Sequence, residues 1–166
     1  EIGVRLVGSE MCIRDRRIPG VVLRTSLISG LPGEGDAEFE ELCSFLREAK
    51  IERAGVFPFS PEEGTPAAKM PHVDAEEAQR RADLIMEIQA GVMDEFNASL
   101  IGKALEVLCL DYDEDSQMWV GRSCYDSPDI DGLVFFDGDG GEGNIVYVNI
   151  TAVADDGNLI GEEVCV

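Results

Sequence analysis

The sequence predicts an α/β segment followed by a small all-β barrel, in a chain of 166 residues. An apolar, β-branched stretch at 21–31 runs into a Gly/Pro turn and then into apolar residues at helical spacing. A second apolar strand at 55–59 completes a βαβ unit. Beyond residue 103 come short β-rich stretches separated by Gly/Asp turns, a pattern typical of a small barrel.

The first strand shows little alternation, which is typical of a strand buried on both faces. Gly30, Pro32 and Gly33 break it, and Asp36 is expected to cap the next helix. The apolar stripe of that helix is Phe39, Leu42, Cys43, Leu46 and Ala49. Prolines in the loop at 60–71 disfavour both helix and paired strand.

A long helix is predicted next, beginning at a capping-box-like Asp74 and Glu77 and running to about Phe96. Its expected apolar face is Ala78, Ala82, Ile85, Ile88, Val92 and Phe96. After a hinge at 97–102, five strands are expected at about 103–110, 117–124, 132–136, 145–154 and 159–165. The Asp-rich turns between them lack the ligand spacing of an EF-hand.

Residues 1–16, EIGVRLVGSEMCIRDR, do not join smoothly to the strand that begins near residue 21. The string VGSEMCIRDR resembles a translated sequencing adapter, so we expect this segment to be a sequencing or assembly artefact. The alternative is a genuine short strand, IGVRLV. The predicted division is therefore artefact at 1–16, α/β segment at 17–98 and barrel at 99–166.

Net charge is −21, and its distribution is uneven. Residues 100–166 hold 15 acidic side chains against Lys103 and Arg122 alone. Such a surface repels nucleic-acid phosphates and suits a basic protein partner, although solubility alone is the alternative explanation. The five cysteines are scattered and form no CxxC pair, and no apolar run is long enough for a membrane span. A cytoplasmic protein that does not enter the membrane is expected.

Candidate binding residues lie in the two loops after the strands, because ligands of α/β folds gather at the carboxyl ends of parallel strands. Gly30 and Gly33 would let the backbone approach a ligand, and Glu34 could accept a hydrogen bond from an amine. Arg24, inside an apolar strand, favours a buried ligand contact over an exposed edge position.

The second loop reads SPEEGTPA, in which Ser60, Glu62, Glu63 and Thr65 could hold a ligand or partner. A rigid surface turn is the alternative for this loop. His72, the only histidine, is expected to be exposed to solvent. The sequence has no Ser/His/Asp set, zinc-site spacing or P-loop, so these chemistries are not predicted.

The motifs LRTSLISGLPGE, GVFPFSPEEGTPAA and GRSCYDSPDIDG, in this order, resemble the radical-SAM methylthiotransferases over residues 17–166. The similarity is greatest to the RimO-type enzymes, which methylthiolate an aspartate of a small-subunit ribosomal protein. The resemblance implies the last part of a radical-SAM (partial TIM-like) barrel followed by a TRAM domain, an OB-like β-barrel that recognises the substrate. It also implies S-adenosylmethionine and two 4Fe-4S clusters as cofactors of the full-length family.

Carried over to this chain, the resemblance assigns the cofactor to Leu27, Ile28, Gly30, Gly33, Glu34, Val56 and Phe57, with Arg24 as a polar contact. It assigns the substrate to the loop of Ser60, Glu62, Glu63 and Thr65. The CxxxCxxC motif that holds the barrel cluster is absent from the 166 residues, and clusters need thiolate ligands. The chain is therefore expected to be a carboxyl-terminal fragment that binds no cluster and is inactive alone.

A basic ribosomal protein is the expected partner, bound through acids of the barrel such as Asp126, Asp129, Asp131 and Asp137. Changing several of these to lysine in a full-length enzyme is predicted to weaken binding. One alternative is a related tRNA methylthiotransferase, but its TRAM domain should be basic. The other is a non-enzymatic binding module built on the barrel.

Overall fold

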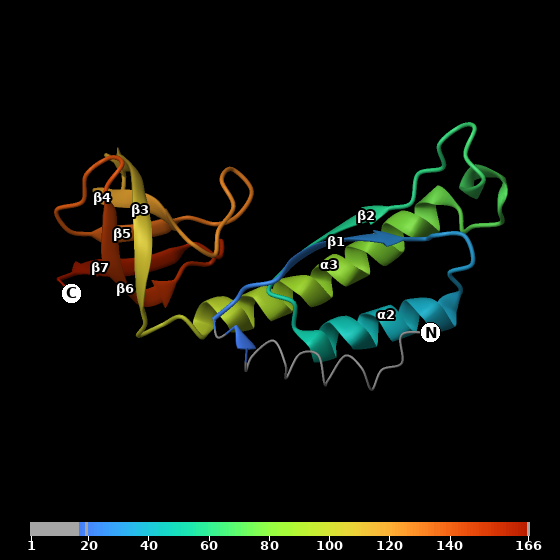
Figure 1. Cartoon of the computed structure of the whole chain (residues 1–166), viewed down its shortest axis with the longest axis horizontal. Coiled ribbons are helices and arrows are strands. Elements are labelled where there is room, and N and C mark those ends of the chain that lie inside the picture. Colours follow the sequence, from blue (N-terminus) through green and yellow to red (C-terminus); the bar gives the residue numbers. More distant parts are fainter. Residues whose placement is uncertain (1–16, 19, 166) are drawn as a thin grey trace. The chain divides into compact units, whose positions relative to one another are not determined.

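The computed structural model of the chain describes residues 17–18 and 20–165 (Figure 1). The predicted artefact at 1–16, and the alternative strand IGVRLV, lie outside the described residues. The chain divides into two compact units after Met93. Each unit has a hydrophobic core of its own.

The first unit is built on two parallel strands, β1 (Arg24–Ser29) and β2 (Arg53–Pro58), joined through helix α2 (Asp36–Ala49). One face of this sheet packs on the helices, where Leu27 and Val56 lie against Leu46 and Ile85. The other face is open, so exposure alternates along β1. The strand–helix–strand prediction is confirmed, but burial of the first strand on both faces is wrong for the described residues.

Helix α2 begins differently from the prediction. Gly35 is the N-cap, and its N–H donates to the Oε2 of Glu38 at 2.9 Å. Asp36 is the first helical residue, and its carboxylate accepts a hydrogen bond from Arg81 instead of capping the helix. At the other end, Lys50 adopts a left-handed conformation, and its N–H closes the last turn on the carbonyl of Leu46.

Helix α3 (Ala75–Ala98) begins as predicted, because the Oδ1 of Asp74 accepts the N–H of Glu77 at 2.8 Å. Its face of Ala78, Ala82, Ile85 and Val92 is buried. The preceding loop contains a 3₁₀ turn, η1 (Ala67–Lys69), which the prolines did not lead us to expect.

The second unit is a closed five-stranded barrel with the strand order β3-β4-β5-β7-β6. Its strands are β3 (Ala104–Asp113), β4 (Met118–Ser123), β5 (Val134–Asp137), β6 (Ile145–Val153) and β7 (Leu159–Val164). Pairing is antiparallel except between β5 and β7. All five predicted strands are present, and the order and size agree with an OB-like barrel.

Gly121 shows why the barrel walls can close. A Cβ at this position would lie 2.5 Å from the Cγ1 of Val107 and 2.6 Å from the carbonyl oxygen of Leu108. No other residue allows β4 to approach β3 so closely. The interior is filled by apolar side chains of β3, β5, β6 and β7, among them Val107, Phe136 and Ile150, none of which is exposed, and the partly buried Trp119 of β4 packs against them.

Among the described residues, no helix combines the length and apolar character that crossing a membrane requires.

Candidate functional site

The carboxyl ends of β1 and β2, with the loops after them, form the candidate site of the first unit (Figure 1). Ile28 and Phe57 are paired across the two strands and lie on the open face, where they are 49% and 58% exposed. Leu27 and Val56 are also paired, but they pack in the core beneath. Of these four predicted cofactor residues, the structure thus brings the side chains of only Ile28 and Phe57 to one surface.

Arg24 lies at the amino end of β1, away from the loops. It lies four positions before Ile28, about 13 Å along the strand at the usual rise per residue. Its side chain is exposed, because the open face of the sheet starts here. The Arg24 side chain thus lies on the same open face as Ile28 and is not buried in the described residues, and its role as a polar contact to a ligand stays a prediction.

Gly30 and Gly33 have different roles in the first loop. Gly30 has a φ of +84°, and a Cβ there would lie 2.7 Å from the Cβ of Ala78 on α3. Gly33 has a φ of +88° with open space around it, and it follows Pro32 in a turn closed by the Glu34 N–H on the carbonyl of Leu31. This is the pattern of a type II turn. Both glycines are thus required by the backbone, whatever the loop binds.

Glu34 is held by the protein itself. Its Oε1 accepts hydrogen bonds from the N–H of Gly30 at 2.9 Å and from the Nη1 of Arg81 at 3.0 Å, and its side chain is 10% exposed. The loop amide of Gly30, which was expected to meet a ligand, is consequently already bound. If Glu34 accepts a ligand amine as predicted, it does so through Oε2.

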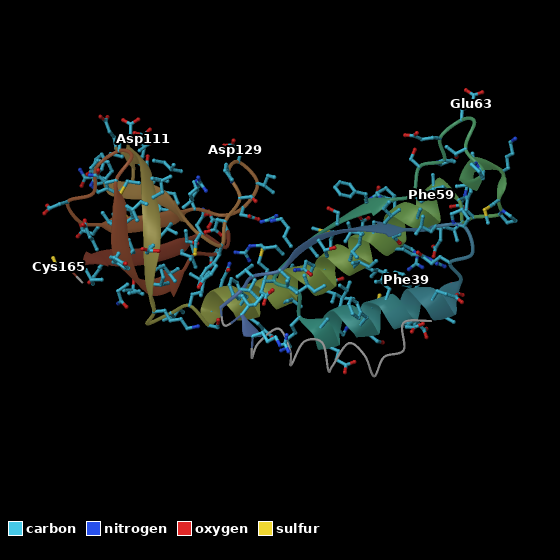
Figure 2. The ribbon with its side chains drawn as sticks, in the orientation of Figure 1. Phe39, Phe59, Glu63, Asp111, Asp129 and Cys165 are labelled. Atoms are coloured by element: carbon cyan, nitrogen blue, oxygen red, sulfur yellow. The ribbon has the colours of Figure 1, made fainter. Side chains whose placement is uncertain are left out.

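Arg81 is the residue that the sequence reasoning missed. Only 3% of its side chain is exposed, and it binds Glu34, Asp36 and Glu77 at 2.8–3.0 Å. It also donates to the carbonyl oxygen of Gly35 and stacks on the ring of Phe39, labelled in Figure 2, at 5.1 Å from the centroid. The spacing of Glu77 and Arg81, four residues apart on a helix, was the available signal.

These contacts lower the pKa of Glu77 to about 2, first through hydrogen bonds from Arg80 and then through those from Arg81. The charge-assisted hydrogen bonds from Arg81 to Glu34 fix the glycine-rich loop to the first turns of α3.

In the second loop, Thr65 is a structural residue. Its hydroxyl donates to the carbonyl of Glu62 at 2.8 Å and accepts the N–H of Ala68, a residue of η1, at 3.3 Å. Ser60, Glu62 and Glu63 are exposed, and Glu63 lies at the tip of the loop in Figure 2. His72 is exposed as predicted, and its ring also contacts Phe59 edge-on at 5.4 Å.

The predicted substrate-binding acids of the barrel are not equivalent. Asp126 is buried, and its Oδ2 accepts both the hydroxyl of Ser123 at 2.6 Å and the Ser123 N–H at 3.2 Å. Asp131 accepts the N–H of Ser127 at 2.6 Å. Asp129 is exposed on the loop between β4 and β5 (Figure 2). Asp126 therefore shapes its turn, and its assignment to the substrate stays a prediction that its burial does not support.

The described cysteines do not form a cluster site. Cys43 and Cys109 are buried in different units, Cys124 and Cys165 are exposed, and all four are free thiols. Burial raises the pKa of both Cys43 and Cys109, which disfavours the thiolate that iron binds. The described residues also contain no group of three His, Cys, Asp or Glu side chains that could hold a metal ion.

Residues 101–164 match the TRAM domain family. Along most of its length, the chain is similar to proteins named ribosomal protein uS12 methylthiotransferase RimO. The protein of Anaeromyxobacter sp. (strain Fw109-5) is 42% identical over 151 residues, which cover 89% of this chain and 32% of that protein. That of Crocosphaera subtropica is 41% identical over 135 residues, covering 81% and 31%. That of Caldanaerobacter subterraneus is 41% identical over 162 residues, covering 92% and 35%.

The resemblance to the methylthiotransferase family is thus confirmed. The chain spans about a third of the length of these relatives.

Proposed function

We propose that this chain is the carboxyl-terminal part of a RimO-type methylthiotransferase. It matches about a third of the length of such an enzyme, and it includes a TRAM domain. The enzyme would add a methylthio group to an aspartate of ribosomal protein uS12, in the cytoplasm. The observation that supports this most strongly is identity above 40% that extends across both units, the βαβ segment as well as the barrel.

The βαβ unit would then be the last part of the radical-SAM barrel, with the open face of β1 and β2 turned toward its interior. Ile28 and Phe57 fit a flat aromatic ring, because they give an apolar surface beside a glycine-rich loop. They would hold the adenine of S-adenosylmethionine, while the backbone of Leu27 and Val56 sets their spacing. In the full-length enzyme this cofactor, after accepting one electron from a cluster held outside this chain, would supply a carbon radical that activates the substrate.

The chain does not fit the iron–sulfur clusters of the family. It lacks CxxxCxxC, and the described thiols are dispersed, with Cys43 and Cys109 buried. We expect anaerobic reconstitution of the 166-residue chain with iron and sulfide to leave an iron stoichiometry near zero. A stable cluster on this chain would contradict the proposal.

A chimaera tests the proposed activity. Residues 17–166 would replace the matching third of the Anaeromyxobacter enzyme, and the product would be assayed by mass spectrometry of uS12 and of tRNA. We expect uS12 to gain one methylthio group and tRNA to gain none. A chimaera that folds and carries its clusters, yet leaves uS12 unmodified or modifies tRNA, would overturn the proposal.

The role of the open face can be tested in the same chimaera. Phe57→Ala should raise the KM for S-adenosylmethionine about tenfold, because it removes the stacking surface. Phe45→Ala, a partly buried position in the core of the same unit, is the control for lost packing. It should lower stability and leave that KM unchanged. Equal effects of the two changes would refute the assignment.

A further inference from the structure

The outer wall of the barrel carries an apolar surface on strands β3 and β6, formed by Leu108, Leu110, Ile145 and Tyr147. We call it the β3–β6 patch. Ile145 is 68% exposed, Leu110 and Tyr147 are each 38% exposed, and Leu108 is half-buried. An exposed apolar side chain alone needs no explanation, but several on one surface are typical of an interaction site.

Strand pairing places these side chains together. Leu108 is directly opposite Ile145, and Glu106 is directly opposite Tyr147. Leu105 and Val107, which alternate with them, point into the core, so Leu108 and its partners point outward. Leu110 lies at the bulge between Cys109 and Asp111, which extends the patch along β3.

The patch is bordered by acids. Glu106 lies at one end and accepts a hydrogen bond from the Tyr147 hydroxyl at 3.0 Å, which raises the pKa of Tyr147. Asp111 lies at the other end of β3 (Figure 2). Glu142 lies in the turn at 141–144, which is joined to Cys109 by two backbone hydrogen bonds. Arg122, opposite Leu108 on β4, is the base beside the patch.

We propose that the β3–β6 patch binds a basic segment of a protein partner, in which aliphatic side chains alternate with Lys or Arg. Aliphatic groups would cover Ile145 and Leu110, and the flanking bases would meet Glu106, Asp111 and Glu142. The apolar contact distinguishes this surface from that of an acidic domain, which would offer a basic partner charge alone. The patch also lies on a different wall from the second and third strands, which OB folds use for nucleic acids.

The inference rests on the proposed function in one respect, the use of uS12 as the natural partner. The test uses the 166-residue chain, with purified uS12 and a short oligolysine peptide as probes. Ile145→Thr removes apolar surface while keeping the β-branched shape that a strand favours. Ile130→Thr is the matched control, because Ile130 is 75% exposed on the loop between β4 and β5.

We expect Ile145→Thr to weaken uS12 binding about fivefold, because the substitution removes part of one apolar contact. The same change should leave oligolysine binding unaltered, because that probe is held by charge alone. Ile130→Thr should alter neither. Glu142→Gln should weaken both probes and flatten the dependence of the affinity on salt.

Each outcome separates this inference from the proposed function. If uS12 binds and Ile145→Thr has no more effect than Ile130→Thr, the β3–β6 patch is refuted while the methylthiotransferase proposal stands. If the chimaera fails on uS12 but the 166-residue chain binds uS12 through Ile145, the patch stands and the enzyme proposal fails. Circular dichroism of each variant confirms that the barrel remains folded.

Discussion

Ser123 and Asp126 stand in GRSCYDSPDIDG, one of the motifs that carry the family resemblance, and both serve the fold. The Asp126 carboxylate accepts two hydrogen bonds from Ser123, and the Ser123 carbonyl accepts the Asp126 N–H. Gly121, two residues earlier, is demanded by the approach of β3. A motif that identifies a family can therefore consist mainly of residues that form a turn.

Asp126→Ala should lower the free energy of unfolding by about 1–3 kcal/mol, because the Ser123 donors lose their buried acceptor. Urea denaturation followed by circular dichroism measures the change. Asp155→Ala, at an exposed acid in the turn before β7, is the control and should change stability little. If both variants unfold at the same urea concentration, the structural role of Asp126 is wrong.

Gly30 and Gly33 offer a matched pair, since both have a positive φ but only Gly30 faces a close neighbour. Gly33→Ala should cost about 1–2 kcal/mol for the left-handed conformation alone. Gly30→Ala should cost about 1–3 kcal/mol more, because its Cβ would overlap Ala78 on α3. Thermal and urea unfolding of the two variants tests this order, and a Gly33→Ala that is the less stable of the two would reverse it.

At the scale of elements, Arg81 fixes the glycine-rich loop to helix α3 through carboxylates from three places in the sequence. Helix α2 begins immediately after this loop, so one guanidinium positions the loop, α2 and α3 together. Such buried charge is tolerated because every side of the guanidinium has a partner.

The ion pairs predict a pH dependence. The folded pKa of Glu77 is about 2, below its ordinary 4.5, so its contribution to stability is complete above about pH 4.5 and is lost as the pH falls toward 2. The melting temperature should therefore fall less between pH 6 and pH 3 in Glu77→Gln than in the unchanged chain. Glu76→Gln, at the exposed neighbour, should retain the full decrease. Identical profiles for all three proteins would contradict the assignment.

Elements were predictable from sequence wherever a single periodicity governs burial. The five barrel strands and the apolar face of α3 fall where alternation and helical spacing place them, because each element has one core side. The face of β1 was not predictable, since an open sheet face and a covered one are both apolar in sequence. Leu27 and Ile28 are adjacent apolar residues, yet they lie on opposite faces.

The candidate site was predictable only in outline. Loops at strand ends were located correctly by general rules of α/β folds. The partners of Glu34, Asp126 and Thr65 were not, because a carboxylate or hydroxyl that binds its own backbone has the same sequence signature as one that binds a ligand. Arg81 escaped notice for a related reason, since its acids are separated from it by up to 47 residues.

At the scale of the whole molecule, the net charge of −21 should oppose compactness through self-repulsion. Sodium chloride should therefore raise the melting temperature. Most of the gain is expected below roughly 0.15 M, where the Debye length has shortened to about 8 Å. An equal osmolarity of sucrose is the control for effects other than screening. A melting temperature that is insensitive to salt, or that falls with it, would show that repulsion is not a significant cost.

The closure of the barrel also limits how this domain can recognise a partner. Every strand of β3–β7 has a neighbour on both sides, so no row of backbone amides and carbonyls is left for an incoming chain to extend. Recognition by the barrel must therefore use side chains. Surface substitutions can change its specificity while the backbone hydrogen bonds between its strands stay intact. The described β1–β2 pair is different: among the described residues its two outer edges have no strand beside them, so this unit offers backbone groups to which another chain could add a strand.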